Sequence, residues 1–517
     1  MYSKTLIKKD NYYDSVTLMS LSNKILNVDG VEDAVVSMGT AMNKDLLNNI
    51  DMATEESEAA GENDLIIAIK AENEEKYATA LEKVEDLLNN KDDKKEEKKE
   101  VKAKTINSAL KDFPEANFAV ISVPGQYAAR EAKIALKNNL NVMLFSDNVS
   151  IEAENELKDL AVEKGLLMMG PDCGTAAINS KGLCFANKVK AGNISLIAAS
   201  GTGLQEVMVQ IDKNGGGVAQ AIGTGGRDLK KEIGGKMMIQ SIKALAADPE
   251  TEVITLISKP PAKEVEAEIL KVAAEIEKKF VICFLESDRA SNDGKIVFAN
   301  TLKDAALKSV EAAGIKVEKK TGIKENKELQ VKIKEAKNKL NKKQKYLRGL
   351  FGGGTLCAEA LYILRDKLEG IKSNIAKNEQ EKLADINNYQ GNVLLDMGED
   401  EFTLGKPHPM IEPSLRNERI LEEAKDPEVG VILLDFELGY GSHSDPTGAS
   451  VKAIEEAKKI AAEDNRELIF VSYICGTESD YQNYSQQAKK LKDVGSILAE
   501  NNVEAAEIAA GILAEEV

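Results

Sequence analysis

The sequence of 517 residues contains no tryptophan and only two histidines, and aromatic residues make up 4% of it. Cores built from such a sequence must be aliphatic and rich in alanine, as in many α/β proteins. Long apolar runs are also missing, since none approaches the roughly 18 residues that a membrane-spanning helix needs. We therefore expect no membrane span. The first 15 residues lack the apolar centre of a signal peptide.

Cysteine is scarce, and its pattern excludes two common uses of the residue. The five cysteines are odd in number and have no CxxC spacing: Cys173, Cys184, Cys283, Cys357 and Cys475. A disulfide framework or a zinc site is therefore not expected, and a reducing, cytoplasmic location is the simplest interpretation. No metal site is predicted.

Positive charge is in deficit, because the formal net charge is −18. Such a chain repels the phosphates of nucleic acids and of anionic membranes. We expect neither as a partner, and the composition fits a small-molecule enzyme or a subunit that binds other proteins.

Apolar strands alternate with helices along most of the chain, which predicts a multidomain α/β protein with Rossmann-like and flavodoxin-like parallel sheets. A small α+β unit precedes them. Its expected strands are Lys4–Lys8, Asp33–Ser37 and Asp64–Lys70, and its expected helices are Ser15–Asn27, Asn43–Asn48 and Glu74–Leu88. The predicted divisions are residues 1–90 (α+β unit), 91–104 (charged linker), 105–190 (Rossmann-like), 191–323 (flavodoxin-like), 324–345 (charged helical linker) and 346–517 (third α/β block).

The sharpest local motif is SLIAASGTGLQEVMVQ, residues 195–210. It predicts a buried strand, a tight turn and a helix that begins at once. Backbone N–H groups at such a helix start can bind a phosphate, a carboxylate or another oxyanion. The alternative is a plain turn in which a hydroxyl caps the helix. The residues expected to bind an anion are Ser200, Gly201, Thr202 and Gly203.

Three further glycine-rich loops follow predicted strands. GTGGRD supplies Gly225, Gly226 and the cation of Arg227, GGGT spans residues 352–355, and GYGSHSD supplies Gly439, Gly441 and Ser442. None of them fits GxxxxGK[ST] or a dinucleotide fingerprint. We predict that they help to hold the same kind of anion.

Both histidines lie in loops of the third block, His408 in GKPHPM and His443 in GYGSHSDP. Histidine acts as acid, base or nucleophile near neutral pH, so both are candidate catalytic residues. A structural hydrogen bond or a helix cap is the alternative for each. Cys173 in GPDCGT lies in a loop with no base nearby in the sequence, so a catalytic thiol is disfavoured there.

Several ordered motifs carry a family resemblance. VPGQYAAREAKIALKNNLNVMLFSDNV, GLLMMGPDCGTAAI, GNISLIAASGTGLQEVMVQIDKNGGGVAQAIGTGGRD and DPETEVITLI resemble the α subunit of succinyl-CoA synthetase. NVLLDMGEDE and DPEVGVILLDFELGYGSHSDPTGA resemble the C-terminal domain of its β subunit. With the N-terminal unit and GKPHPMIEP, the layout resembles the FdrA family of acyl-CoA-synthetase-like proteins.

The resemblance implies a fused pair of succinyl-CoA-synthetase-type subunits, with a CoA-binding-like domain at 105–190 and a ligase-CoA-like domain at 346–517. It also implies that two helix starts, at Ser200–Gly203 and near Gly439–His443, face one anion. The sequence departs from the synthetases where ESDRASNDGKIVFANT lacks their phosphorylated histidine and Lys259 replaces a glutamate. The glycine loop that cradles CoA and the ATP-grasp half are not recognisable.

The resemblance implies a subunit of a carbamoyltransferase that acts on oxamate and carbamoyl phosphate in ureide and purine breakdown. Arg227 would neutralise substrate charge, and His408 or His443 would move a proton. One alternative is an acyl-CoA ligase that uses CoA and an acyl phosphate, and another is a non-catalytic scaffold. No cofactor is required, although CoA stays open. A homodimer with partner subunits and a small carboxylate substrate are expected.

Overall fold

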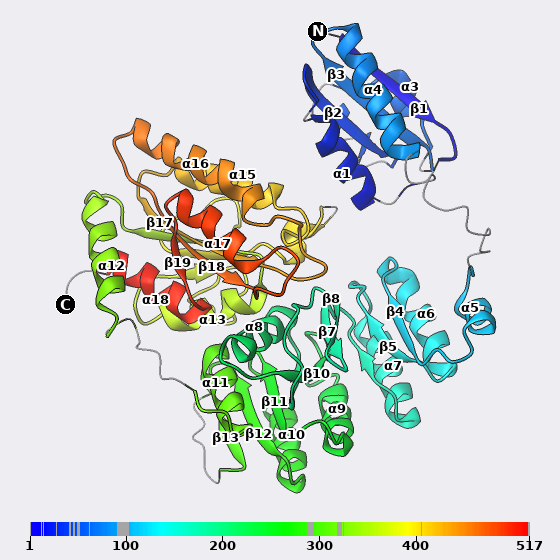
Figure 1. Cartoon of the computed structure of the whole chain (residues 1–517), viewed down its shortest axis with the longest axis vertical. Helices are drawn as coiled ribbons and strands as arrows, with labels where there is room; N and C mark the ends of the chain where they lie inside the picture. The colour runs from blue at the N-terminus through cyan, green and yellow to red at the C-terminus, as the bar shows by residue number, and fades with distance from the viewer. Residues whose placement is uncertain are drawn as a thin grey trace. The chain divides into compact units, whose positions relative to one another are not determined.

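The computed structural model describes residues 2–11, 13, 15–26, 28–40, 43–44, 47–48, 52–61, 63–89, 103–287, 294–317, 323, 325–404 and 406–514. The chain folds into two compact units, Met1–Ala103 and Lys104–Val517, coloured along the chain in Figure 1. Over the described ranges, no helix has the length and apolar character needed to cross a lipid bilayer.

The first unit is a three-stranded antiparallel sheet in the order β1-β3-β2. Alternate residues of the central strand enter two different apolar clusters, Ile67 and Ile69 in one and Ile66 and Ala68 in the other. Both faces of the sheet are therefore covered. The bounds are β1 Tyr2–Lys8, α1 Ser15–Leu26, β2 Val31–Met38, α3 Glu55–Ala59, β3 Leu65–Ala71 and α4 Glu74–Asn89. The predicted strands and the first and last predicted helices are confirmed, whereas the helix predicted at Asn43–Asn48 lies partly outside the described residues.

The second unit begins with a small parallel sheet in the order β4-β5-β6. Helix α6 packs against it through small residues that recur at helical spacing, Ala128, Ala132 and Ala135, all fully buried. The bounds are α5 Ile106–Asp112, β4 Phe118–Ile121, α6 Gly125–Lys137, β5 Asn141–Leu144, α7 Ile151–Lys164 and β6 Met168–Met169.

A seven-stranded sheet follows, in the order β13-β12-β11-β9-β10-β7-β8. Five of its strands are parallel, and the hairpin β7-β8 joins one edge in antiparallel fashion. The bounds are β7 Thr175–Ile178, β8 Lys181–Cys184, β9 Ile194–Ala198, α8 Gly201–Lys213, β10 Val218–Gly223, α9 Lys236–Ala247, β11 Val253–Ser258, α10 Lys263–Glu275, β12 Lys279–Phe284, β13 Ile296–Phe298 and α11 Leu302–Ala312.

The last sheet has six strands, all parallel, in the order β15-β16-β14-β17-β18-β19. Its helix α12 comes from the segment predicted to be a charged helical linker, and Leu329 and Ala336 of that helix are buried. The bounds are α12 Lys327–Lys339, β14 Tyr346–Phe351, α13 Gly354–Leu364, β15 Lys372–Ser373, β16 Val393–Asp396, α14 Asp400–Thr403, α15 Ser414–Ala424, β17 Val429–Glu437, α16 Gly448–Glu463, β18 Ile469–Cys475, α17 Tyr484–Asp493, β19 Ile497–Ala499 and α18 Asn502–Leu513.

The two larger sheets have the same doubly wound order. Apart from the two-residue edge strand β15, the first parallel strand of each sheet lies between the next two, β9 between β10 and β11 and β14 between β16 and β17, so the direction of winding reverses beside it. Ligands of such folds bind at this reversal, beyond the carboxyl ends of the strands. The loops that follow β9, β11, β14 and β17 are therefore the places to look for a site.

The two larger sheets also share one hydrophobic core. A single cluster of buried side chains includes Leu196 and Val207 from the seven-stranded sheet and its helix α8, and Leu347, Leu356 and Tyr473 from the six-stranded sheet and its helix α13. Because apolar burial is the dominant favourable term in folding, the two sheets are held as one body, as Figure 1 shows for α8, α11, α13 and α18.

The small sheet is fastened to the seven-stranded sheet by a buried ionic cluster. Lys158 of α7 is fully buried, and its ammonium group lies 2.8 Å from Glu154 and 2.9 Å from Asp228. It also donates to the carbonyl of Thr224 at 2.9 Å. Asp228 in turn accepts from the backbone N–H groups at the start of α9.

Replacing Lys158 with methionine should strongly destabilise the chain, because two carboxylates would be left buried with less neutralising charge. We expect a loss of about 3–5 kcal/mol in the free energy of unfolding. Lys231→Met is the matched control, since Lys231 is 78% exposed and its partner Glu264 lies 3.5 Å away. That control should cost less than about 1 kcal/mol. Urea unfolding of the full chain measures both, and equal losses would contradict the role given to Lys158.

Candidate functional site

The loop after β9 turns directly into helix α8, as predicted. Ser200 is the N-cap residue, and its hydroxyl accepts the backbone N–H of Gly203 at 3.0 Å. The N–H of Leu204 bonds to the carbonyl of Ser200. The N–H groups of Gly201 and Thr202 have no acceptor within the helix, because they belong to its first turn. Two donors therefore stay available at this helix start.

A second helix start meets the first one. The hydroxyl of Ser200 is hydrogen-bonded to the hydroxyl of Thr355, and the N–H of Thr355 donates to the hydroxyl of Thr202 at 3.2 Å. A Cβ atom at Gly203 would lie 3.0 Å from the methyl carbon of Thr355, so glycine permits this approach. The starts of α8 and α13 thus face each other at the winding reversals of their two sheets. We call residues 200–203 and 352–355 the facing loops.

The glycine loop 352–354 already contacts an anion from its own sheet. The carboxylate of Asp435, on β17, accepts the N–H groups of Gly352 at 2.7 Å and Gly353 at 2.8 Å. Arg416 neutralises it from the other side at 3.2 Å. An internal carboxylate therefore takes the place at this loop that a ligand anion would take.

Glu437 lies two residues further along β17 and is also buried, with 3% of its surface exposed. Burial and the neighbouring Asp435 raise the pKa of Glu437 well above its ordinary value. Burial of two adjacent carboxyl groups thus favours the protonated form of Glu437, while Arg416 and the two backbone donors contact Asp435. Sequence reasoning missed both acids, although a strand reading VILLDFEL places two carboxyl groups in an otherwise apolar run.

Asp396 ends strand β16 beside the start of α13. One of its carboxylate oxygens accepts the N–H of Gly398 at 3.0 Å, and a Cβ atom at Gly354 would meet the other. Burial raises the pKa of Asp396 to about 7, against the opposing charge of Lys259, which lies in the loop after β11. This carboxyl group gains or loses a proton near neutral pH, so it is suited to acid–base work.

His408 lies next to the same glycine loop. A Cβ atom at Gly398 would lie 2.5 Å from its Nε2 and 3.2 Å from a carboxylate oxygen of Asp396. Its Nδ1 accepts the N–H of Met410 at 3.2 Å, and burial lowers its pKa to about 4. His408 is therefore neutral near pH 7 and carries its proton on Nε2.

His443 and its glycine loop contact a different segment. The Nδ1 of His443 accepts the backbone N–H of Asp445, and the backbone N–H of His443 donates to the carbonyl of Met410. Gly439, with φ of 120°, and Gly441 pack closely against the end of β8, at Cys184, Phe185 and Ala186. The backbone N–H of Tyr440 donates to the carbonyl of Ala186. Ser442 is buried, and its hydroxyl has no hydrogen-bond partner in the part of the chain that the structure describes. Ser200 and Thr202 therefore contact the loop 352–355. The loop 439–443 instead contacts the segment of His408, through the hydrogen bond from His443 to Met410.

The loop after β10 faces the small sheet. Gly225 adopts φ of 88° and packs against Pro171. The guanidinium of Arg227 pairs with the buried Glu154 at 2.8 Å and donates to the carbonyl of Val149 at 2.7 Å. The charge of Arg227 is therefore engaged by α7, and Gly226 lies beside it in sequence. Cys173 is buried beneath this loop, and burial raises its pKa to about 12, which makes it an unreactive thiol.

Two lysines, Lys259 and Lys377, lie close together near the facing loops, which the sequence analysis did not predict. The ammonium group of Lys377, which follows β15, donates to the carbonyl of Pro260 at 3.4 Å. Burial and the nearby Lys259 lower the pKa of Lys377. Positive charge thus gathers at the loop after β11, next to Asp396 and the facing loops.

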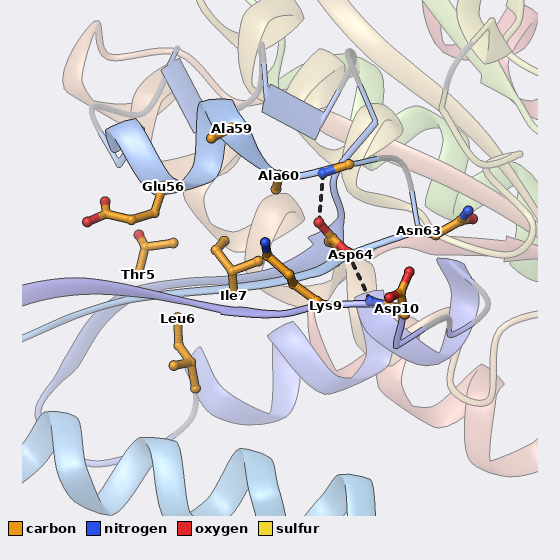
Figure 2. A pocket seen from close by; sticks show the side chains of 11 residues that line it. Thr5, Leu6, Ile7, Lys9, Asp10, Glu56, Ala59, Ala60, Asn63 and Asp64 are labelled. Atoms are coloured by element: carbon orange, nitrogen blue, oxygen red, sulfur yellow. Dashed lines mark hydrogen bonds between the residues drawn. The ribbon is translucent and has the colours of Figure 1, made fainter.

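The first unit has an open cavity of about 710 Å³ beside β1. Figure 2 shows its lining, where the carboxylate of Asp64 accepts the N–H groups of Asp10 and Gly61. The lining also includes Ile7 and Glu56. None of the residues predicted as a site lies in this unit.

Three family models match different parts of the chain. "AllF, heavy metal-associated domain" matches residues 1–105, "CoA binding domain" matches 189–286 and "CoA-ligase" matches 350–512. Residues 1–105 contain neither cysteine nor histidine. Among the described residues there is also no group of three or more His, Cys, Asp or Glu side chains that could hold a metal ion. The donor set of this unit therefore does not fit a soft heavy-metal ion.

Among solved structures, the chain resembles an ATP citrate lyase from Methanothrix soehngenii, determined with citrate and coenzyme A. That match has 19% identity and a TM-score of 0.31, and covers 42% of this chain and 38% of the other.

Among curated proteins, the succinate–CoA ligase (ADP-forming) subunit alpha 2 of Archaeoglobus fulgidus is 24% identical over 214 residues, which is 40% of this chain and 73% of that protein. The YahF protein of Escherichia coli (strain K12) is 48% identical over 517 residues, which is 100% of this chain and 98% of that protein. Matching YahF at this identity over its whole length, the chain belongs to the YahF family.

Proposed function

We propose that the chain is a subunit of an acyl-CoA-synthetase-like enzyme and that its facing loops bind the small acid or acyl phosphate whose acyl group is transferred to CoA. The observation that carries this proposal is the direct contact between a helix start in the CoA-binding match and one in the CoA-ligase match, through Ser200, Thr202 and Thr355.

The chemistry of the facing loops suits such a group. The N–H donors of Gly201 and Thr202 lie at the positive end of α8, where a carboxylate or phosphate is stabilised. The hydroxyl groups of Ser200 and Thr355 contact each other beside these donors. Lys259 supplies a cation, and Asp396 supplies a proton near neutral pH. Oriented donors and an acid with a matched pKa are what acyl transfer requires.

A second candidate is the carbamoyltransferase subunit, acting between carbamoyl phosphate and oxamate with partner subunits. The observation that favours it is the absence of histidine from residues 189–286, which leaves no phosphate carrier there. Transfer of a carbamoyl group from carbamoyl phosphate to a small acid needs no such carrier, and the same anion donors would serve.

Titration calorimetry of the full chain with CoA, and phosphate release from carbamoyl phosphate and oxamate, separate the two candidates. The acyl-CoA proposal predicts saturable CoA binding and no oxamate-dependent phosphate release. Absence of CoA binding, together with oxamate-dependent phosphate release in the presence of the partner subunits, would replace it with the carbamoyltransferase.

Ser200→Ala tests the facing loops. Loss of the cap should lower the free energy of unfolding by about 1 kcal/mol, and loss of the hydroxyl should weaken binding of acetyl phosphate. Ser150→Ala is the matched control, because Ser150 caps α7 by accepting the N–H of Ala153 at 3.2 Å and lies outside the facing loops. The control should lose similar stability and keep its affinity, measured by calorimetry. Equal affinities in the two variants would count against an anion at the facing loops.

Asp396→Asn tests the proton. The folded-state pKa of about 7 lies above the ordinary value of 3.8, so the native state binds more protons between these values. The contribution of Asp396 to the free energy of unfolding is therefore fully present at low pH and is lost as the pH rises toward 7. Asparagine stays neutral, so the variant should gain stability over the wild type by up to about 1.4 kcal/mol per pH unit in this window.

Thermal unfolding at pH 5 and pH 8 measures that difference. Asp385→Asn is the control, since Asp385 is an exposed residue of the loop before β16. A stability difference between Asp396→Asn and wild type that does not change between the two pH values would show that Asp396 is ionised throughout.

A further inference from the structure

The small parallel sheet of the second unit has an open edge at β4. In the order β4-β5-β6, strand β4 pairs on one side only, with β5. The carbonyls of Asn117 and Ile121 accept N–H groups from β5, which fixes the inward side of the strand. In a parallel pair both backbone groups of a residue point the same way, so those of Phe118 and Val120 point to the open edge.

Charge is absent from this edge. Residues 116–129 contain no Asp, Glu, Lys or Arg, in a chain where these types make up 30% of all residues. Four other edge strands carry a charged side chain, Lys4 in β1, Glu32 in β2, Lys181 in β8 and Lys372 in β15, whereas the short edge strands β6, β13 and β19 carry none. Charged side chains on edge strands prevent pairing with other chains. Strand β4 lacks this protection.

Apolar side chains are exposed on and around the same strand. Val120 is 51% exposed, Tyr127 at the start of α6 is 56% exposed, and Phe113 just before the strand is 68% exposed. Val123, 37% exposed, follows the strand. Val120, Val123 and Tyr127 are thus exposed within the uncharged stretch, and exposed apolar side chains that gather in this way mark a contact surface.

We propose that β4 pairs antiparallel with β4 of a second copy of this chain, which joins two three-stranded sheets into one six-stranded sheet across a twofold axis. A twofold interface places each residue and its copy in the same patch, so a charge near the axis would face its own like charge. The uncharged stretch 116–129 satisfies this condition, although the whole chain carries a net charge of −18.

The outward backbone groups define the registers that the pairing allows. A hydrogen-bonded pair must join residues whose backbone groups point outward, so Phe118 pairs with Val120 of the second copy, or Val120 or Phe118 pairs with its own copy. The first register places an aromatic ring opposite a β-branched side chain, a favourable cross-strand pair. Tyr127 and Phe113 then lie beside the joined strands and add apolar contact.

Analytical ultracentrifugation of the full chain tests this inference. We expect a dimer for the wild type and a shift to monomer for Val120→Lys, with at least a tenfold rise in the dissociation constant. Val331→Lys is the matched control, because Val331 of α12 is 55% exposed and lies away from β4. That variant should stay dimeric. A wild-type monomer, or a dimer that Val120→Lys leaves intact, would overturn the proposal.

Val120→Cys provides a second measurement that does not depend on weakening the interface. Mild oxidation should give a disulfide-linked dimer on a non-reducing gel, whereas Val331→Cys should stay unlinked. Val120 faces its own copy in only one register, so Ala119→Cys and Phe118→Cys, which face their own copies in the other registers, are tested beside it; no cross-link in any of the three variants, where ultracentrifugation shows a dimer, would mean that the two copies meet elsewhere. Protection of the β4 amides from hydrogen exchange in a monomer would mean that something other than a second copy covers the edge.

Discussion

The head-to-head contact of α8 and α13 is the interaction on which the rest of this molecule depends. Each helix start carries a partial positive charge, so two of them placed end to end repel each other. The structure offsets that repulsion with oxygen atoms. The hydroxyls of Ser200, Thr202 and Thr355 lie between the two helices, and the carboxylate of Asp435 accepts the N–H groups of the loop before α13. These acceptors offset the repulsion at the point where the starts of α8 and α13 meet.

This arrangement explains why acids crowd around a loop that was expected to bind an external anion. Asp435 accepts the N–H groups of Gly352 and Gly353, and its proximity helps to raise the pKa of the buried Glu437. The N–H donors of the loop before α13 therefore have an acceptor within the chain. The α8 side keeps the N–H groups of Gly201 and Thr202, and it is the α8 side that faces Lys259 in its own sheet. Under the proposed function, an incoming anion would have its donors at the start of α8 and its acid, Asp396, at the end of β16 beside α13.

The sequence predicted the fold well, because buried parallel strands followed by glycine turns have a distinctive pattern. NISLIAASGTG and LRGLFGGGT each gave a strand, a turn and a helix where the structure has them. The local sequence pattern could not predict which of these turns contact each other, because that depends on the order of the strands in each sheet. Thr355 was part of a recognised loop, yet only the doubly wound order of both sheets brings it to Ser200. Arg227 was a reasonable anion ligand by composition, and only the buried Glu154 in α7 shows that its charge is engaged.

The open edge of β4 illustrates the same limit, since an apolar strand in a parallel sheet has the same composition whether it is central or outermost.

The surroundings of His408 determine which form of the imidazole is present. Burial and the donated N–H of Met410 keep His408 neutral, with its proton on Nε2, so it can donate a hydrogen bond but cannot act as the nucleophile in that form. Asp396, beside it, titrates near neutral pH. The catalytic roles predicted for His408 and His443 stay predictions, and under the proposed function Asp396 would supply the proton beside the neutral donor His408, which suits the transfer of a group that arrives and leaves on oxygen.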